Sequence, residues 1–208
     1  EKEKEEKEKE ETKPFEEEKE NKKEFTDSTF KDVKKESWYY DSVKYCFENS
    51  LMEGTGDYFE PDTPMTRAML VTILFRLSGS DAGKVNPFSD VDADSWYSDA
   101  VMWASENGIV KGITETKFAP DEKITREQAV TVIVRYLYYI KADVNEKADL
   151  SSYNDSENIS PWAADAFSVA VKAGIVTGTS EETLSPDLST TRAEIATIVM
   201  RLCENILK

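Results

Sequence analysis

Three arginines are the residues whose type and position most suggest a binding site. Each follows a threonine that could cap a helix, so each would occupy a first helical position. They are Arg67, Arg126 and Arg192. A cation is mildly disfavoured there, because the macrodipole is positive at a helix N-terminus. The guanidinium could pair with an acid of a neighbouring unit, or it could join free backbone N–H groups in an anion site that binds a carboxylate. Candidate acids are Asp41, Asp99 and Asp165.

Tryptophan and glycine recur with these arginines and could complete a binding groove. The tryptophans are Trp38, Trp96 and Trp162, and the glycines are Gly54, Gly112 and Gly178. An aromatic residue at the start of a helix usually fills a core, whereas a partly exposed indole in a groove would stack on a sugar ring. The glycines most simply need unusual backbone dihedrals, although a bare backbone also permits close approach of a ligand.

These residues keep their spacing in three copies and therefore belong to a repeated unit. The distances between successive tryptophans are 58 and 66 residues. In each copy a Pro-Asp pair precedes the Thr-Arg pair, and a second arginine follows nine residues after the first. We predict repeats at residues 28–80, 86–142 and 151–206, which together form one structural unit.

Each repeat is predicted to be a helix, a loop and a second helix. The first helix is expected to open at the tryptophan, with a Ser or Asp cap just before it, as in Ser160-Pro161. Gly108 and Gly174 suit a left-handed helix stop, for which the first repeat has Ser50.

The second helix of each repeat is expected to start at its threonine. Thr125 and Thr191 have Gln or Glu three residues later and predict capping boxes, whereas Thr66 can only cap singly. Each second helix has one apolar face, which a two-helix unit cannot bury alone. Three second helices packed together could share one core, which predicts an all-α fold with a central helical bundle.

Composition and charge exclude several classes of function. The 208 residues contain 42 acids, 26 Lys and Arg and no histidine, which gives a net charge of −16. Such a chain would be repelled by nucleic acid and by anionic lipid. Without imidazole it has neither the commonest general base nor the commonest metal ligand. No apolar run approaches the length of a membrane span.

The first 27 residues differ from the rest and predict a charged linker. Residues 1–24 contain 12 Glu and 8 Lys, so they cannot bury enough apolar surface to fold alone. The chain begins without Met, and we expect it to be a fragment or a processed form whose cargo lies upstream of Glu1.

The repeating acids do not form a catalytic constellation, because caps and turns explain them. Asp90-x-Asp92-x-Asp94 resembles the start of a calcium loop, but Ser95 and Val101 replace the required Gly and Glu, so a capped turn is favoured. We predict no enzyme, no metal and no cofactor. Cys46 and Cys203 are expected to be small buried fillers, although a bond between the first and third repeats is possible.

The pattern F-x-D-V…W…A-V…G-I-V-x-G…F-x-P-D…I-T-R-E-Q-A resembles the S-layer homology domain family. The second repeat carries it almost whole, and the likeness covers roughly residues 28–205. The first repeat departs from it at Ser50 and Met69, and the third at Tyr153 and Ser156.

The resemblance implies a pseudo-threefold unit with grooves between repeats. In that family such a unit binds secondary cell-wall polysaccharide, often through a pyruvylated amino sugar, and anchors extracellular proteins on Gram-positive-type walls. It also implies that Arg67, Arg126 and Arg192 contact the acidic sugar. The alternative is a helical-repeat scaffold that binds an acidic peptide or a partner protein.

Overall fold

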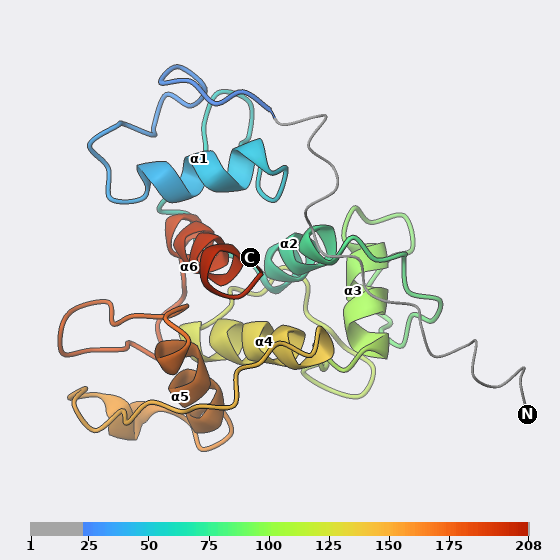
Figure 1. Cartoon of the computed structure of the whole chain (residues 1–208). Helices are drawn as coiled ribbons and strands as arrows, with labels where there is room; N and C mark the ends of the chain where they lie inside the picture. The colour runs from blue at the N-terminus through green and yellow to red at the C-terminus, as the bar shows by residue number, and fades with distance from the viewer. Residues whose placement is uncertain (1–22, 208) are drawn as a thin grey trace, which may run out of the picture.

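The structure, a computed structural model, describes residues 23–207 and is built from helices (Figure 1). Within those residues there is no β-strand, so the predicted all-α class is confirmed. No helix in this range is long and apolar enough to cross a membrane. The elements are α1 (Tyr40–Glu48), α2 (Arg67–Ser78), α3 (Ser98–Glu106), α4 (Arg126–Tyr139), the short 3-10 helix η3 (Ser156–Asn158), α5 (Ala164–Lys172) and α6 (Arg192–Asn205).

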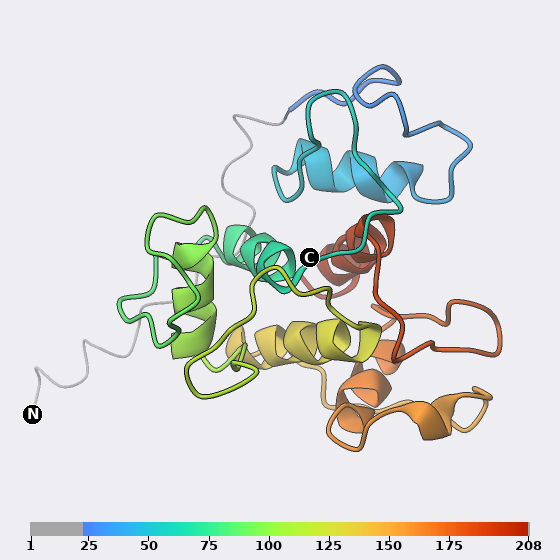
Figure 2. The same ribbon diagram turned by 180° about the vertical axis from the view of Figure 1, so that it is seen from behind.

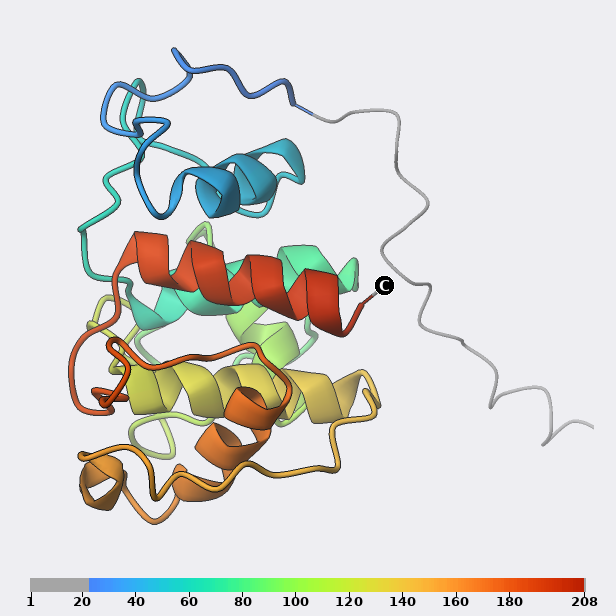
Figure 3. The same cartoon turned by 60° about the vertical axis from the view of Figure 1, so that its left-hand side comes forward.

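The second helices of the three repeats form the centre, as the shared apolar core predicts. Figures 1 and 2 show α2, α4 and α6 around a common middle, with α1, α3 and α5 outside them. Each outer helix packs on the central helix of the preceding repeat: α3 on α2, α5 on α4 and α1 on α6. The chain therefore closes into a ring, and Figure 3 shows α6 of the third repeat alongside α1 of the first.

Backbone hydrogen bonds close the same ring around the pseudo-threefold axis. The N–H of Met65 donates to the oxygen of Thr190 over 2.8 Å, that of Thr190 to Ile124 over 3.1 Å, and that of Ile124 to Met65 over 2.9 Å. Each of these residues directly precedes the threonine that caps a central helix. The three helix starts are thereby fixed to one another.

The central helices begin as the sequence predicts. Thr66, Thr125 and Thr191 are the N-caps, and each side chain accepts from the backbone N–H three residues on. Capping boxes are present at Thr125 and Thr191, and Thr66 caps singly.

The outer helices begin later than predicted. They start two residues after each tryptophan, and their N-cap positions have no side-chain cap. The serine expected to cap with its hydroxyl instead accepts with its backbone carbonyl, as in the 2.8 Å bond from Ala163 N–H to Ser160. Each tryptophan therefore lies in a turn outside the helix.

The outer helices end as predicted. Gly108 and Gly174 adopt φ values of 68° and 69°, and Ser50 adopts 56° at the equivalent position. The first repeat thus makes the same left-handed stop without glycine, at some conformational strain.

The first repeat also uses residues that were assigned to the charged linker. Phe25 is only 8% exposed and packs against the rings of Phe30, Tyr40 and Phe47. Residues 1–22 of the predicted linker lie outside the described part of the chain.

Candidate functional site

The three arginines connect neighbouring repeats through backbone carbonyls. Their exposed fractions are 9% for Arg67, 6% for Arg126 and 9% for Arg192. Arg67 Nε donates to Phe118 O over 2.9 Å and its Nη2 to Lys111 O over 3.0 Å. The equivalent bonds run from Arg126 and Arg192 to carbonyls of the third and first repeats: Arg126 Nη2 to Thr177 O (2.8 Å), Arg192 Nε to Phe59 O (2.8 Å) and Arg192 Nη2 to Glu53 O (2.6 Å).

The predicted pairing of these arginines with the first-turn acids is therefore wrong, although Arg126 does have another acid of the neighbouring repeat, Glu194, 4.0 Å from its Nη1. Asp41, Asp99 and Asp165 do lie in the first turns of α1, α3 and α5, but all three are exposed. Asp165 pairs with Lys147 at 2.8 Å instead. Because the outer helices turn these acids to solvent, the buried guanidinium groups meet the loop carbonyls of the next repeat.

The predicted use of free amides at the helix N-termini is also wrong. In α2 the N–H of Arg67 donates to Glu122 O, that of Ala68 donates to Pro120 O, and that of Met69 is capped by Thr66. The corresponding amides of α4 and α6 donate to the Pro-Asp loops of the third and first repeats. An anion site at the starts of the central helices must therefore be formed by side chains.

An aspartate whose role the sequence analysis missed holds each acceptor loop in place. Asp90 accepts from the N–H groups of Phe118 and Ala119, both over 2.8 Å, and Ala119 has a φ of 60°. Asp32 and Asp155 do the same in the other repeats. Desolvation raises the pKa of Asp90, but these two N–H groups, together with its own backbone N–H and Lys117, lower it more, so its pKa lies below the ordinary value. The same Asp stands at this position in all three repeats, and this repetition was the one feature of the sequence that could have predicted its structural role.

One pocket, here called the Arg67 pocket, brings together an arginine, a glycine and a tryptophan of the predicted sets. Its volume is about 160 Å³, and Arg67, Gly112 and Trp162 come from three different repeats. The remaining lining residues are Val71, Val110, Lys111, Phe118, Ile124, Gln128, Thr131, Val132 and Arg135. The lining thus contains three cations and, among the described residues, no acid.

Charge distinguishes this pocket from a second hollow. The second hollow, of about 490 Å³, is lined by Asp32, Glu60 and Asp62 together with Tyr39, Thr63 and two prolines. It has three acids and no cation among the described residues, so it would repel an anion. An anionic ligand would therefore favour the Arg67 pocket.

Burial shapes the electrostatics of the Arg67 pocket. Desolvation lowers the pKa of Arg67, while the nearby acids Glu122 and Asp90 raise it. A guanidinium still keeps its proton under all physiological conditions. It lies 4.7 Å from the centre of the Phe118 ring, a cation–π contact that helps to hold the side chain at the wall of the pocket.

The tryptophans do not fill the core, which contradicts the usual role of such a residue. Trp38, Trp96 and Trp162 are 67%, 63% and 54% exposed. Because each lies in the turn before its helix, its indole projects outward; Trp38 and Trp96 rest edge-on against Tyr39 and Tyr97. Trp162 is the one that lines the Arg67 pocket.

The three glycines are needed for space and not for unusual dihedrals. None of Gly54, Gly112 and Gly178 has a positive φ. A Cβ on Gly112 would lie 2.2 Å from Thr114 O and 2.4 Å from Lys117 O, and the other two would clash in the same way. Only a bare backbone fits where this loop folds back on itself.

The described residues contain no group of three or more potential metal ligands. Asp92 accepts from the N–H of Asp94, which agrees with the capped turn favoured over a calcium loop.

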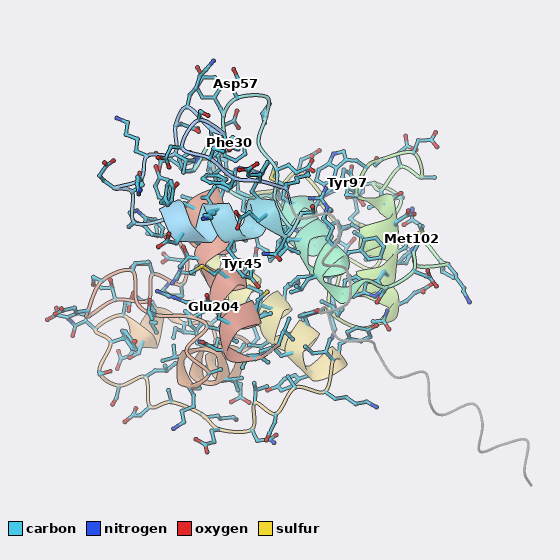
Figure 4. The ribbon with its side chains drawn as sticks, turned by 45° about the horizontal axis from the view of Figure 1, so that its top comes forward. Phe30, Tyr45, Asp57, Tyr97, Met102 and Glu204 are labelled. Carbon is cyan, nitrogen blue, oxygen red and sulfur yellow. The ribbon has the colours of Figure 1, made fainter. Side chains whose placement is uncertain are left out.

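Cys46 and Cys203 are free and buried, so their role as fillers is confirmed and they are not bonded. Burial raises the pKa of the Cys203 thiol to about 11. Figure 4 shows Tyr45 of α1 near Glu204 of α6, where these helices meet.

Comparison with known proteins agrees with the repeats. The family model described as S-layer homology domain matches residues 29–68, 87–130 and 152–196. An endoglucanase of Bacillus sp. (strain KSM-635) is 34% identical over 175 residues, which is 83% of this chain and 18% of that protein. The surface-layer 125 kDa protein of Lysinibacillus sphaericus is 32% identical, over 80% of this chain and 14% of that protein. A cellulosome-anchoring protein of Acetivibrio thermocellus is 29% identical, over 72% and 34%.

The chain spans less than a fifth of the length of the endoglucanase and of the surface-layer protein. The endoglucanase matches this chain only over the S-layer homology region, and that same region occurs in a surface-layer protein and in a cellulosome-anchoring protein. The shared segment is therefore a binding or anchoring module and is itself non-catalytic.

Proposed function

The chain belongs to the S-layer homology domain family, and on this basis we propose that it anchors a protein non-covalently to the wall of a Gram-positive-type bacterium. The proposed ligand is an acidic secondary cell-wall polysaccharide, recognised through a carboxylate-bearing sugar such as a pyruvylated amino sugar. The cargo would be the rest of the same polypeptide. The surface-layer and cellulosome-anchoring relatives support this placement at the cell surface.

The observation that carries the proposal is the composition of the Arg67 pocket. Its lining offers Arg67, Lys111 and Arg135 for a carboxylate, and an exposed indole, Trp162, for the apolar face of a sugar ring. Gln128 and Thr131 could bond sugar hydroxyls. A small pocket of this volume suits one residue of a polysaccharide.

The net charge of −16 does not oppose this ligand. Exposed charges are screened over about 8 Å at physiological ionic strength, so distant acids contribute little at the pocket. A carboxylate entering it meets three cations first. The chain would therefore reject a bulk polyanion but hold a single acidic sugar.

The proposal is tested by co-sedimentation of the chain with purified sacculi. The chain should sediment with intact sacculi and stay in solution once the attached polysaccharide has been removed chemically. Removal of the pyruvate ketal alone should have nearly the same effect. Binding that survives removal of the polysaccharide would exclude the glycan as ligand and favour a protein partner.

A matched pair of variants links this binding to the pocket. Trp162→Ala should weaken sedimentation strongly, whereas Tyr138→Ala, which removes a similarly exposed ring outside the pocket, should not. Both variants should keep the melting temperature of the parent. Equal binding by both variants would argue against the pocket as the binding site.

A further inference from the structure

We propose that the three pseudo-symmetric sites of this chain are unequal, that the Arg67 pocket is the one that holds a carboxylate-bearing sugar, and that Lys111 and Gln128 determine this. The inference rests on the proposed function and specifies where in the chain it resides. The Arg126 and Arg192 sites are defined here as the residues at the corresponding positions around those two arginines.

The first difference is the residue before the recurrent glycine. Its carbonyl accepts from the arginine in all three repeats, but its side chain is Lys111 in the Arg67 pocket, Thr177 at the Arg126 site and Glu53 at the Arg192 site. Only Lys111 adds a cation. Glu53 adds an acid, which pairs with Lys23.

The second difference is the third residue of the central helix that faces each arginine. It is Gln128 in the Arg67 pocket, Glu194 at the Arg126 site and Met69 at the Arg192 site. Glu194 Oε1 lies 4.0 Å from Arg126 Nη1, so this arginine already has a carboxylate beside it. A ligand carboxylate at this site would be repelled by Glu194.

The third difference concerns the second arginine of each site. Arg201 donates to the hydroxyl of Thr177 over 3.0 Å, and Arg76 donates to Leu51 O over 3.1 Å. Arg135, which lines the Arg67 pocket, makes no hydrogen bond or ion pair with any residue in 23–207. Its guanidinium therefore keeps its full donor capacity for a ligand.

All three differences favour binding of an anion in the Arg67 pocket over binding at the other two sites. The Arg67 pocket has three cations and no acid among its described residues. The Arg126 site has two arginines and one glutamate, and the Arg192 site has two arginines and a glutamate that is paired with Lys23. The guanidinium of Arg126 is also less firmly held, because Leu184 replaces the aromatic ring and Nε has no partner within the described chain. We expect one strong carboxylate site per chain.

Isothermal titration calorimetry with a pyruvate-ketal N-acetylhexosamine as the probe tests the assignment. The parent chain should bind one equivalent and should not bind the ketal-free sugar. Lys111→Thr, which installs the residue of the third repeat, should weaken binding about tenfold, the effect of losing one charge-assisted contact. Lys84→Thr removes an exposed lysine of the segment that joins the first and second repeats, outside the pocket, and should leave the affinity unchanged.

The reciprocal variant tests whether the two positions are sufficient. Thr177→Lys combined with Glu194→Gln makes the Arg126 site resemble the Arg67 pocket and should raise the stoichiometry to two. A stoichiometry that remains at one, or equal affinities for Lys111→Thr and Lys84→Thr, would overturn the assignment. The proposed function would still stand if these variants sediment with sacculi like the parent. It fails if the parent does not sediment, or if the parent still sediments after the polysaccharide has been removed.

Discussion

Replacement of the buried arginines should destabilise the chain unequally, and the order follows from their hydrogen bonds. Arg192 donates to Phe59 O over 2.8 Å and to Glu53 O over 2.6 Å, and its guanidinium lies 4.6 Å from the centre of the Phe59 ring. Arg126 makes one such bond, to Thr177 O, and has a buried Nε with no partner among the described residues. We therefore expect Arg192→Ala to destabilise more than Arg126→Ala.

The size of the difference can be worked out from these contacts. A hydrogen bond with a charged donor contributes about 1.5–3 kcal/mol, and a cation–π contact contributes about 0.5–2 kcal/mol. Arg192→Ala loses two such bonds and the contact, which gives about 3.5–8 kcal/mol. Arg126→Ala loses one bond and the 4.0 Å ion pair with Glu194. It also removes an unpaired buried donor that itself costs about 1–3 kcal/mol, so its net effect is about 1 kcal/mol.

Urea unfolding followed by circular dichroism measures both values against the parent chain. Since Arg192 joins the third repeat to the first, across 133 and 139 residues of chain, its loss weakens the closure of the ring. Arg67→Ala should resemble Arg192→Ala, because Arg67 makes the same pair of bonds and lies over Phe118. An Arg126→Ala variant as unstable as Arg192→Ala would refute this reasoning.

Three further predictions concern the loops and the N-terminal segment. Gly112→Ala should lower the free energy of unfolding by about 2 kcal/mol or more, because its Cβ would overlap two carbonyl oxygens; an unchanged urea midpoint would contradict this. Asp90 has a pKa below its unfolded value of 3.8, so its stabilisation is complete above that value and is lost as the pH falls through the lower folded pKa. Asp90→Asn should therefore flatten the loss of stability between about pH 5 and pH 2 in acid titrations, and an unaltered slope would exclude this role. Phe25→Ala should lower stability by about 3 kcal/mol, because a ring buried among three others is removed; an unchanged melting temperature would show that this segment is dispensable.

The central helices were predictable because their determinants are local. A capping threonine and its partner lie three residues apart, so Thr125 with Gln128 and Thr191 with Glu194 predict a helix start without knowledge of distant contacts. The left-handed stops at Gly108 and Gly174 are equally local.

The site was only partly predictable, because its partners are distant in sequence. The residue types were correct, in that Arg67, Gly112 and Trp162 do line one pocket. Their roles were not: the exposure of the indole depends on a turn that starts the helix two residues late, and the glycine is required by carbonyls that only the folded loop brings close.

Residue spacing within a few turns of chain was enough to predict the number of repeats, their helices and the caps of the central helices. Tertiary structure alone decided where each buried arginine bonds, 44 to 139 residues away, and which acids face solvent. It also decided that the cations of one pocket would gather from two repeats while the third repeat supplied the indole. The neighbours of each side chain depend on how the three repeats close into a ring. These contacts between repeats therefore cannot be predicted from the sequence of any single repeat.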